Sequence, residues 1–145
     1  MQNTTNYLKA KIIETIKAQG GKISFADFMQ AALYTPNLGF YSNSNPTFGA
    51  QGAFITAPEL SPLFGQTLAL EVKNLMRHGS LNTLLEFGAG SGKLALSLLL
   101  ELEKQQSLPE QYIIIELSGS LREAQQLLIK QKAPGLLPRV TWYDS

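Results

Sequence analysis

Two carboxylates and three glycines stand where an α/β protein would bind a small ligand. Glu86, Gly88, Gly90 and Gly92 form a Glu-x-Gly-x-Gly-x-Gly pattern after one apolar run, and Glu116 ends the next apolar run. Glycines at a strand-to-helix turn let a ligand approach the backbone, and the start of the helix offers free N–H groups. A carboxylate at the end of the second strand can accept hydrogen bonds from both hydroxyls of a ribose. The spacing therefore predicts a nucleotide-type ligand.

Alternating apolar strands and helices must position these residues. The sequence predicts strands at 83–87, 111–117 and 140–143, with helices at 91–103 and 119–132 between them. Such alternation indicates an α/β fold with a Rossmann-like, doubly wound parallel sheet. In open sheets of this kind, ligands bind at the carboxyl ends of the strands, where Glu86 and Glu116 would lie.

Two other glycine motifs resemble this turn and fit it less well. A phosphate-binding P-loop would need glycine at Phe87 and a serine or threonine at Leu94. A dinucleotide fingerprint would need glycine at Lys93, where a side chain would obstruct close packing of helix on strand. An NAD(P)-dependent oxidoreductase is thus disfavoured, although it stays open as an alternative.

Residues 1–80 are expected to form a helical N-terminal extension, and residues 81–145 a second domain. Helices are predicted at about 5–19, after the capping residue Ser24, and after Ser61-Pro62. The segment from Tyr34 to Pro58 is rich in glycine and proline. Its aromatic side chains argue against disorder because they would gain by burial; they are Tyr34, Phe40, Tyr41, Phe48 and Phe54.

Composition excludes several classes of function. The net charge is +1 without a cluster of basic residues, so nucleic acid is not an expected partner. Cysteine is absent, which excludes disulfides and a thiol nucleophile, and no metal site is predicted. No apolar stretch approaches the ~20 residues of a membrane span. The N-terminus does not resemble a signal peptide, and no arginine precedes Arg77. We expect a bacterial cytoplasmic protein, or a mitochondrial matrix protein if the source is eukaryotic.

The glycine turn resembles motif I of class I methyltransferases, and this resemblance implies S-adenosyl-L-methionine as the cofactor. In that family the acidic residue of the motif, here Glu86, helps to hold the methionine end of the cofactor. The sulfonium and ammonium groups of this cofactor suit a carboxylate better than a phosphate cradle. The cofactor-binding residues implied in this region are Glu86, Gly88, Ala89, Gly90, Gly92, Glu116 and Leu117.

The chain resembles one methyltransferase family more closely, that of MidA and the mitochondrial complex I assembly methyltransferase. Its most specific motif is Thr56-Ala57-Pro58-Glu59 followed by Phe64-Gly65, and Glu116-Leu117-Ser118 adds to it. The resemblance extends from about Ile23 to Trp142. It implies a Rossmann-type methyltransferase with a helical extension that methylates a protein side chain, which is arginine in the mitochondrial branch.

The family resemblance also implies roles for the loop at 56–59. This loop would fold over the cofactor, with Thr56 and Pro58 in contact with it. Glu59 is the candidate catalytic residue, and the other catalytic residues are unknown. The same loop can also be interpreted as the turn before a helix capped by Ser61, and both interpretations stay open.

Departures from the family raise a second hypothesis. Ala53 stands where the family has aspartate, and Gly119 stands where it has proline. Family members run to several hundred residues. We therefore expect the chain to hold only the first half of the cofactor domain, truncated after the third strand and inactive alone. A C-terminal half or a second copy would then be a partner. The alternative is a catalytically inactive, methyltransferase-like scaffold that binds a partner protein.

Overall fold

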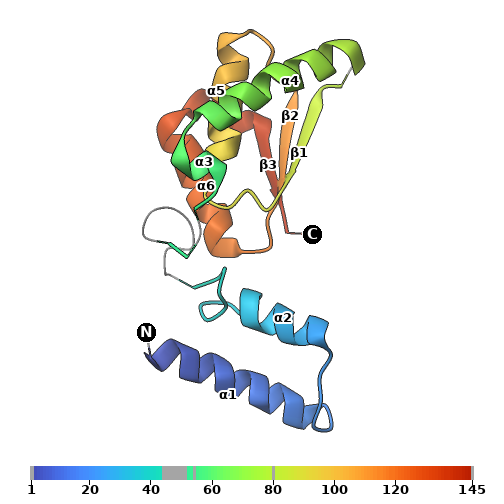
Figure 1. The fold of residues 1–145 in the computed structure, drawn as a ribbon, viewed down its shortest axis with the longest axis vertical. Coiled ribbons are helices and arrows are strands. Elements are labelled where there is room, and N and C mark those ends of the chain that lie inside the picture. The colour runs from blue at the N-terminus through green and yellow to red at the C-terminus, as the bar shows by residue number, and fades with distance from the viewer. Residues whose placement is uncertain (1, 44–51, 54, 80, 145) are drawn as a thin grey trace. The chain divides into compact units, whose positions relative to one another are not determined.

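Residues 2–43, 52–53, 55–79 and 81–144 are described by a computed structural model (Figure 1). Contacts divide the chain into two units, Met1–Asn45 and Pro46–Ser145. The division into domains 1–80 and 81–145 stays a prediction. All the residues of the predicted cofactor site belong to the second unit.

Two helices form the first unit. Helix α1 spans Gln2–Ala18 and helix α2 spans Phe25–Tyr34, close to the predicted positions. Gly20 and Gly21 follow α1 with φ angles of 77° and 89°, the left-handed region in which glycine terminates helices. Ser24 caps α2 through its side chain, as predicted.

The chain after α2 folds back onto that helix. The backbone N–H groups of Phe40 and Tyr41 both donate to carbonyls of α2 at 2.9 Å. The ring of Tyr41 lies 5.7 Å from that of Tyr34 and 5.0 Å from that of Phe40, centre to centre. These three rings pack against one another; that the whole aromatic segment is ordered stays a prediction. Phe48 and Phe54 lie outside the described residues.

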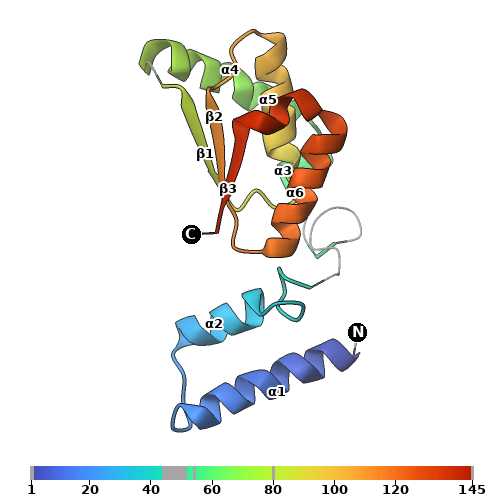
Figure 2. The same cartoon turned by 180° about the vertical axis from the view of Figure 1, so that it is seen from behind.

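A three-stranded parallel sheet forms the centre of the second unit, in the order β1-β2-β3. Its elements are β1 (Thr83–Phe87), α5 (Lys93–Lys104), β2 (Gln111–Ile115), α6 (Gly119–Lys132), the short 3-10 helix η1 (Pro134–Arg139) and β3 (Val140–Tyr143). Helices α5 and α6 lie on the same face of the sheet (Figures 1 and 2). The predicted Rossmann-like parallel fold is confirmed.

Two further helices precede the sheet in the second unit. The four-residue helix α3 spans Ala57–Leu60, and α4 spans Leu63–Gly79. Helix α4 begins one residue after the predicted start, and the hydroxyl of Ser61 accepts from the Leu63 N–H at 3.1 Å. The segment at 56–59 is thus a helical turn before α4, which was one of its two interpretations.

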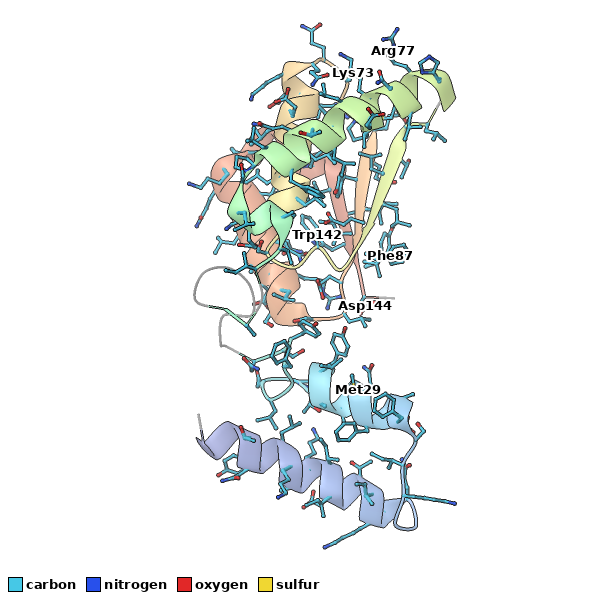
Figure 3. All side chains as sticks on the ribbon, viewed as in Figure 1. Met29, Lys73, Arg77, Phe87, Trp142 and Asp144 are labelled. Carbon is cyan, nitrogen blue, oxygen red and sulfur yellow. The ribbon has the colours of Figure 1, made fainter. Side chains whose placement is uncertain are left out.

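The apolar composition of β1 indicates a buried strand, but the structure buries only one of its faces, and only partly. The side chains of Leu84 and Glu86 are partly buried, whereas those of Leu85 and Phe87 are 52% and 72% exposed. Figure 3 shows Phe87 directed away from the helices. Within the second unit, helices α5 and α6 lie on the other face of the sheet (Figures 1 and 2). An apolar composition cannot by itself distinguish a covered strand from one with a single open face.

Gly65 lets α4 approach α5 closely. A Cβ atom at this position would overlap the Ser97 hydroxyl and lie 3.2 Å from the backbone nitrogen of Leu98. We expect Gly65→Ala to lower the free energy of unfolding by about 1–3 kcal/mol, because such overpacking outweighs the better helix propensity of alanine. Urea denaturation measures this change in the free energy of unfolding. Gly135→Ala is the control, because no atom lies within 4 Å of its Cβ position. An equal midpoint for both variants would contradict the close packing.

Candidate cofactor-binding site

The glycines of the turn after β1 have different structural roles. Gly88, Gly90 and Gly92 have φ angles of 64°, 56° and 80°. Residues other than glycine rarely adopt this positive-φ region of the backbone. No atom lies within 4 Å of the Cβ position of Gly88, so a ligand can approach the backbone there. The Cβ position of Gly92 lies instead 3.1 Å from the Cγ atom of Gln125. Gly88 therefore opens the turn to a ligand, whereas Gly92 allows the start of α5 to pack against α6.

Glu86 presents a partly buried carboxylate near the carboxyl end of β1. The hydroxyl of Tyr112, from β2, donates to its Oε2 atom at 2.7 Å. Burial raises the pKa of the Glu86 carboxyl, the hydrogen bond from Tyr112 lowers it, and the nearby charge of Glu116 raises it. The net pKa lies above the ordinary value. A cationic ligand group beside Glu86 would compensate for the cost of burying this charge.

Glu116 follows β2 directly and is held in place by two donors. Glu116 is only 5% exposed. The backbone N–H of Ser118 donates to Oε1 at 3.0 Å, and Nε2 of Gln125 donates to Oε2 at 3.2 Å. A carboxylate has about four acceptor sites, so these two bonds orient the group and leave acceptors for ligand hydroxyls.

Gln125 connects the glycine turn to Glu116, a role that was not predicted from the sequence. Its Nε2 atom donates to the carbonyl of Gly90 at 2.9 Å as well as to Glu116, and its Oε1 atom accepts from Nε1 of Trp142 at 3.0 Å. Figure 3 labels Trp142 beside the helices. One signal was present in the sequence: Gln125 interrupts the apolar i, i+4 stripe between Leu121 and Ile129.

Glu59, the candidate catalytic residue, contacts the glycine turn from α3. Its side chain is 4% exposed, and its carboxylate accepts hydrogen bonds from the Ser91 hydroxyl and from Nζ of Lys93, the latter at 2.6 Å. Burial raises the pKa of Glu59, but the hydrogen bonds from Lys93 and Ser91 and the charge of Lys93 outweigh it, so the pKa is lowered. Its catalytic role stays a prediction.

A cavity of about 300 Å³ lies between α3, the end of β1 and the glycine turn. Its lining residues are Thr56, Pro58, Glu59, Glu86, Phe87, Gly88, Ala89, Gly90, Ser91 and Leu94. Most of the predicted cofactor contacts therefore surround one space. Gly92, Glu116 and Leu117 do not line it. Gly92 packs on α6, Glu116 is 5% exposed and bonded to Ser118 and Gln125, and Leu117 is 48% exposed.

A comparison with models of protein families shows to which family this chain belongs. The model of a family described as "Putative S-adenosyl-L-methionine-dependent methyltransferase" matches residues 63–145, more than half of the chain. The chain belongs to this family. The resemblance inferred from the glycine turn and the 56–65 motif is thus confirmed, and so is the cofactor class of the family.

Curated relatives of the chain carry the name protein arginine methyltransferase NDUFAF7. The mitochondrial homologue from Caenorhabditis elegans is 33% identical over 129 residues, which cover 84% of this chain and 30% of the relative. The mitochondrial protein of Danio rerio is 40% identical over 96 residues, covering 64% of this chain and 21% of the relative. The chain thus spans less than a third of the length of these relatives.

A solved structure shares the fold of the chain. The crystal structure of a Burkholderia thailandensis protein bound to S-adenosyl-homocysteine is 40% identical and superposes with a TM-score of 0.87. The match covers 99% of this chain and 38% of that protein. A second, native crystal structure of a protein from the same species is also 40% identical and gives a TM-score of 0.81.

Proposed function

We propose that this chain forms the cofactor-binding part of a methyltransferase that transfers a methyl group from S-adenosyl-L-methionine to a protein side chain. The observation that carries the proposal is the pairing of an open glycine turn at Gly88 with two oriented carboxylates, Glu86 and Glu116. Membership of the methyltransferase family and the S-adenosyl-homocysteine held by the Burkholderia protein support the same ligand.

The residues present fit this cofactor chemically. The carboxylate of Glu86 would hold the ammonium group of the methionine part, and Glu116 would accept hydrogen bonds from the ribose hydroxyls. The open backbone at Gly88 and the cavity walls Thr56 and Pro58 would enclose the ligand between them. When bound, the cofactor supplies an activated methyl group. The residues of this chain bind and orient it, which is a large part of what such a transfer requires.

We propose that the methyl acceptor is an arginine side chain of a protein. Relatives of the chain are named protein arginine methyltransferases. They are also named mitochondrial, whereas a bacterial cytoplasmic location for this chain stays a prediction. Among the described residues, no helix is long and apolar enough to cross a membrane.

A catalytically inactive scaffold is the second candidate, and Ala53 favours it. The resembled family has a carboxylate at this position, beside the segment that forms one wall of the cavity. Such a scaffold could retain ligand binding while lacking methyl transfer. Measuring methyl transfer to arginine-containing proteins, alongside ligand binding, separates the two candidates.

Calorimetric titration tests the proposed ligand. We expect the protein, as this chain or within any longer chain that contains it, to bind S-adenosylhomocysteine and to show no measurable heat with NAD⁺. The reason is that Lys93 occupies the glycine position that close approach of a dinucleotide requires. Binding of NAD⁺ in preference to S-adenosylhomocysteine would overturn the proposal and restore the oxidoreductase alternative.

A further inference from the structure

One side chain connects α3 to the glycine turn, and we name its contacts the Glu59 clamp. The clamp consists of the Glu59 carboxylate, the Ser91 hydroxyl and the Lys93 ammonium group. The two donors engage different oxygens of Glu59, since Ser91 donates to Oε1 and Lys93 to Oε2. The interaction joins residues that are 32 and 34 positions apart in sequence.

Helix α3 has few other means of holding its position. It has only four residues, and helices this short are not stable without tertiary contacts. Its backbone bonds are local, from the N–H groups of Glu59 and Leu60 to the carbonyl of Thr56. Of its larger apolar side chains, Leu60 is 74% exposed and Pro58 is half-buried. The enclosed carboxylate of Glu59 therefore contributes polar contacts that tie α3 to the glycine turn.

The position of α3 determines the shape of the cofactor cavity. Thr56 and Pro58 precede Glu59 in sequence and line the same cavity as Glu86 and Gly88. If Glu59 left Ser91 and Lys93, this wall would lose its side-chain hydrogen bonds to the turn. The clamp thus couples the wall to the start of α5, where the turn itself ends.

We propose that Glu59 is a positioning residue, which fixes α3 against the glycine turn and so sets the width of the cofactor cavity. This inference rests on the proposed function. It also assigns a role to Lys93, the residue at which the turn departs from a dinucleotide fingerprint. A general base works best with a pKa near the operating pH. Burial raises the pKa of Glu59, but the hydrogen bonds from Lys93 and Ser91 and the charge of Lys93 outweigh it and lower the pKa, which makes this carboxylate a weaker base.

Hydrogen exchange of the ligand-free protein tests whether the clamp holds α3. In Glu59→Gln and in Lys93→Met, we expect the amides of Glu59 and Leu60 to exchange about tenfold faster, because local opening of α3 becomes easier. Glu101→Gln is the matched control. Its pair with Lys104 has the same chemistry on α5 but lies within that helix and outside the cavity. Unchanged exchange at 59–60 in both clamp variants would overturn the proposal.

Ligand affinity tests whether the clamp also positions the cavity wall. We expect both clamp variants to weaken S-adenosylhomocysteine binding about three- to tenfold, Lys93→Arg to restore it, and the double variant to lose no more than either single one. Faster exchange with unchanged affinity would overturn the positioning role. Unchanged affinity with abolished methyl transfer would instead identify Glu59 as catalytic. If the wild-type protein bound no S-adenosylhomocysteine, the proposed function and the positioning role would fail together, and the exchange data would still show whether the clamp forms.

Discussion

Glu116→Gln weakens the binding of S-adenosylhomocysteine by about 10- to 100-fold at neutral pH, because hydrogen bonds to a charged group contribute roughly 1.5–3 kcal/mol. The wild-type carboxylate accepts from Ser118 on one oxygen and from Gln125 on the other. A glutamine has a single acceptor oxygen, so its NH2 group would face one of these donors. The side chain must then turn, and the ribose hydroxyls lose an oriented, charged acceptor. Isothermal titration calorimetry measures the loss.

The control for this variant is Glu123→Gln, an exposed carboxylate on the same helix as Gln125. We expect its affinity to equal that of the wild type. Adenosine locates the effect within the ligand: Glu116→Gln should weaken adenosine and S-adenosylhomocysteine in the same proportion, since both carry the ribose. Equal affinity of Glu116→Gln and the wild type for both ligands would show that Glu116 does not bind the ribose.

The sequence predicted the elements of the cofactor unit well because their signals are local. Strand β1, helix α6 and strand β3 have the expected bounds, since each is an apolar or amphipathic run delimited by turn residues. Strand β2 ends at Ile115 rather than 117, although the N–H of Glu116 still donates to the carbonyl of Tyr143 in β3 at 2.9 Å. The open face of β1 could not be predicted, since it depends on which elements pack against Leu85 and Phe87.

The contacts that orient the site could not be read from local patterns. Gln125 bonds to Gly90 across 35 positions, and Tyr112 bonds to Glu86 across 26. These pairs follow from the register of β1 on β2 and from the rotation of α6 about its axis. Only the three-dimensional structure determines this register and this rotation. The carboxylates were found because their chemistry identifies them, whereas an amide and a phenol acquire a role only through their neighbours.

Lowering the pH from neutral to mildly acidic values weakens S-adenosylhomocysteine binding, and Glu86→Gln removes this dependence at the cost of affinity. Burial raises the pKa of Glu86, and the hydrogen bond from Tyr112 only partly opposes it. The ammonium group of the ligand needs the ionised carboxylate. Affinity is therefore lost as the pH falls through the raised pKa, by up to about tenfold for each pH unit below it. An ordinary glutamate would lose its charge only at lower pH.

The stability of the ligand-free protein falls with rising pH over the same pH range, whereas ligand affinity rises. Because the folded-state pKa of Glu86 is raised, its protonated form is favoured by folding. Its contribution to stability is fully present below the ordinary glutamate pKa and is lost as the pH rises through the raised value. Between the two, rising pH strengthens ligand binding and weakens the ligand-free fold. Thermal denaturation with and without S-adenosylhomocysteine, measured across this range, detects both effects.

Tyr112→Phe provides the matched test of the cause. Removing the hydroxyl deletes the one interaction that lowers the pKa of Glu86, while the ring remains in place. We therefore expect the pH midpoint of S-adenosylhomocysteine binding to move upward in Tyr112→Phe and the pH dependence to vanish in Glu86→Gln. If Glu86→Gln kept the wild-type pH profile, another group would control the binding, and Glu86 would not be the partner of the ligand ammonium.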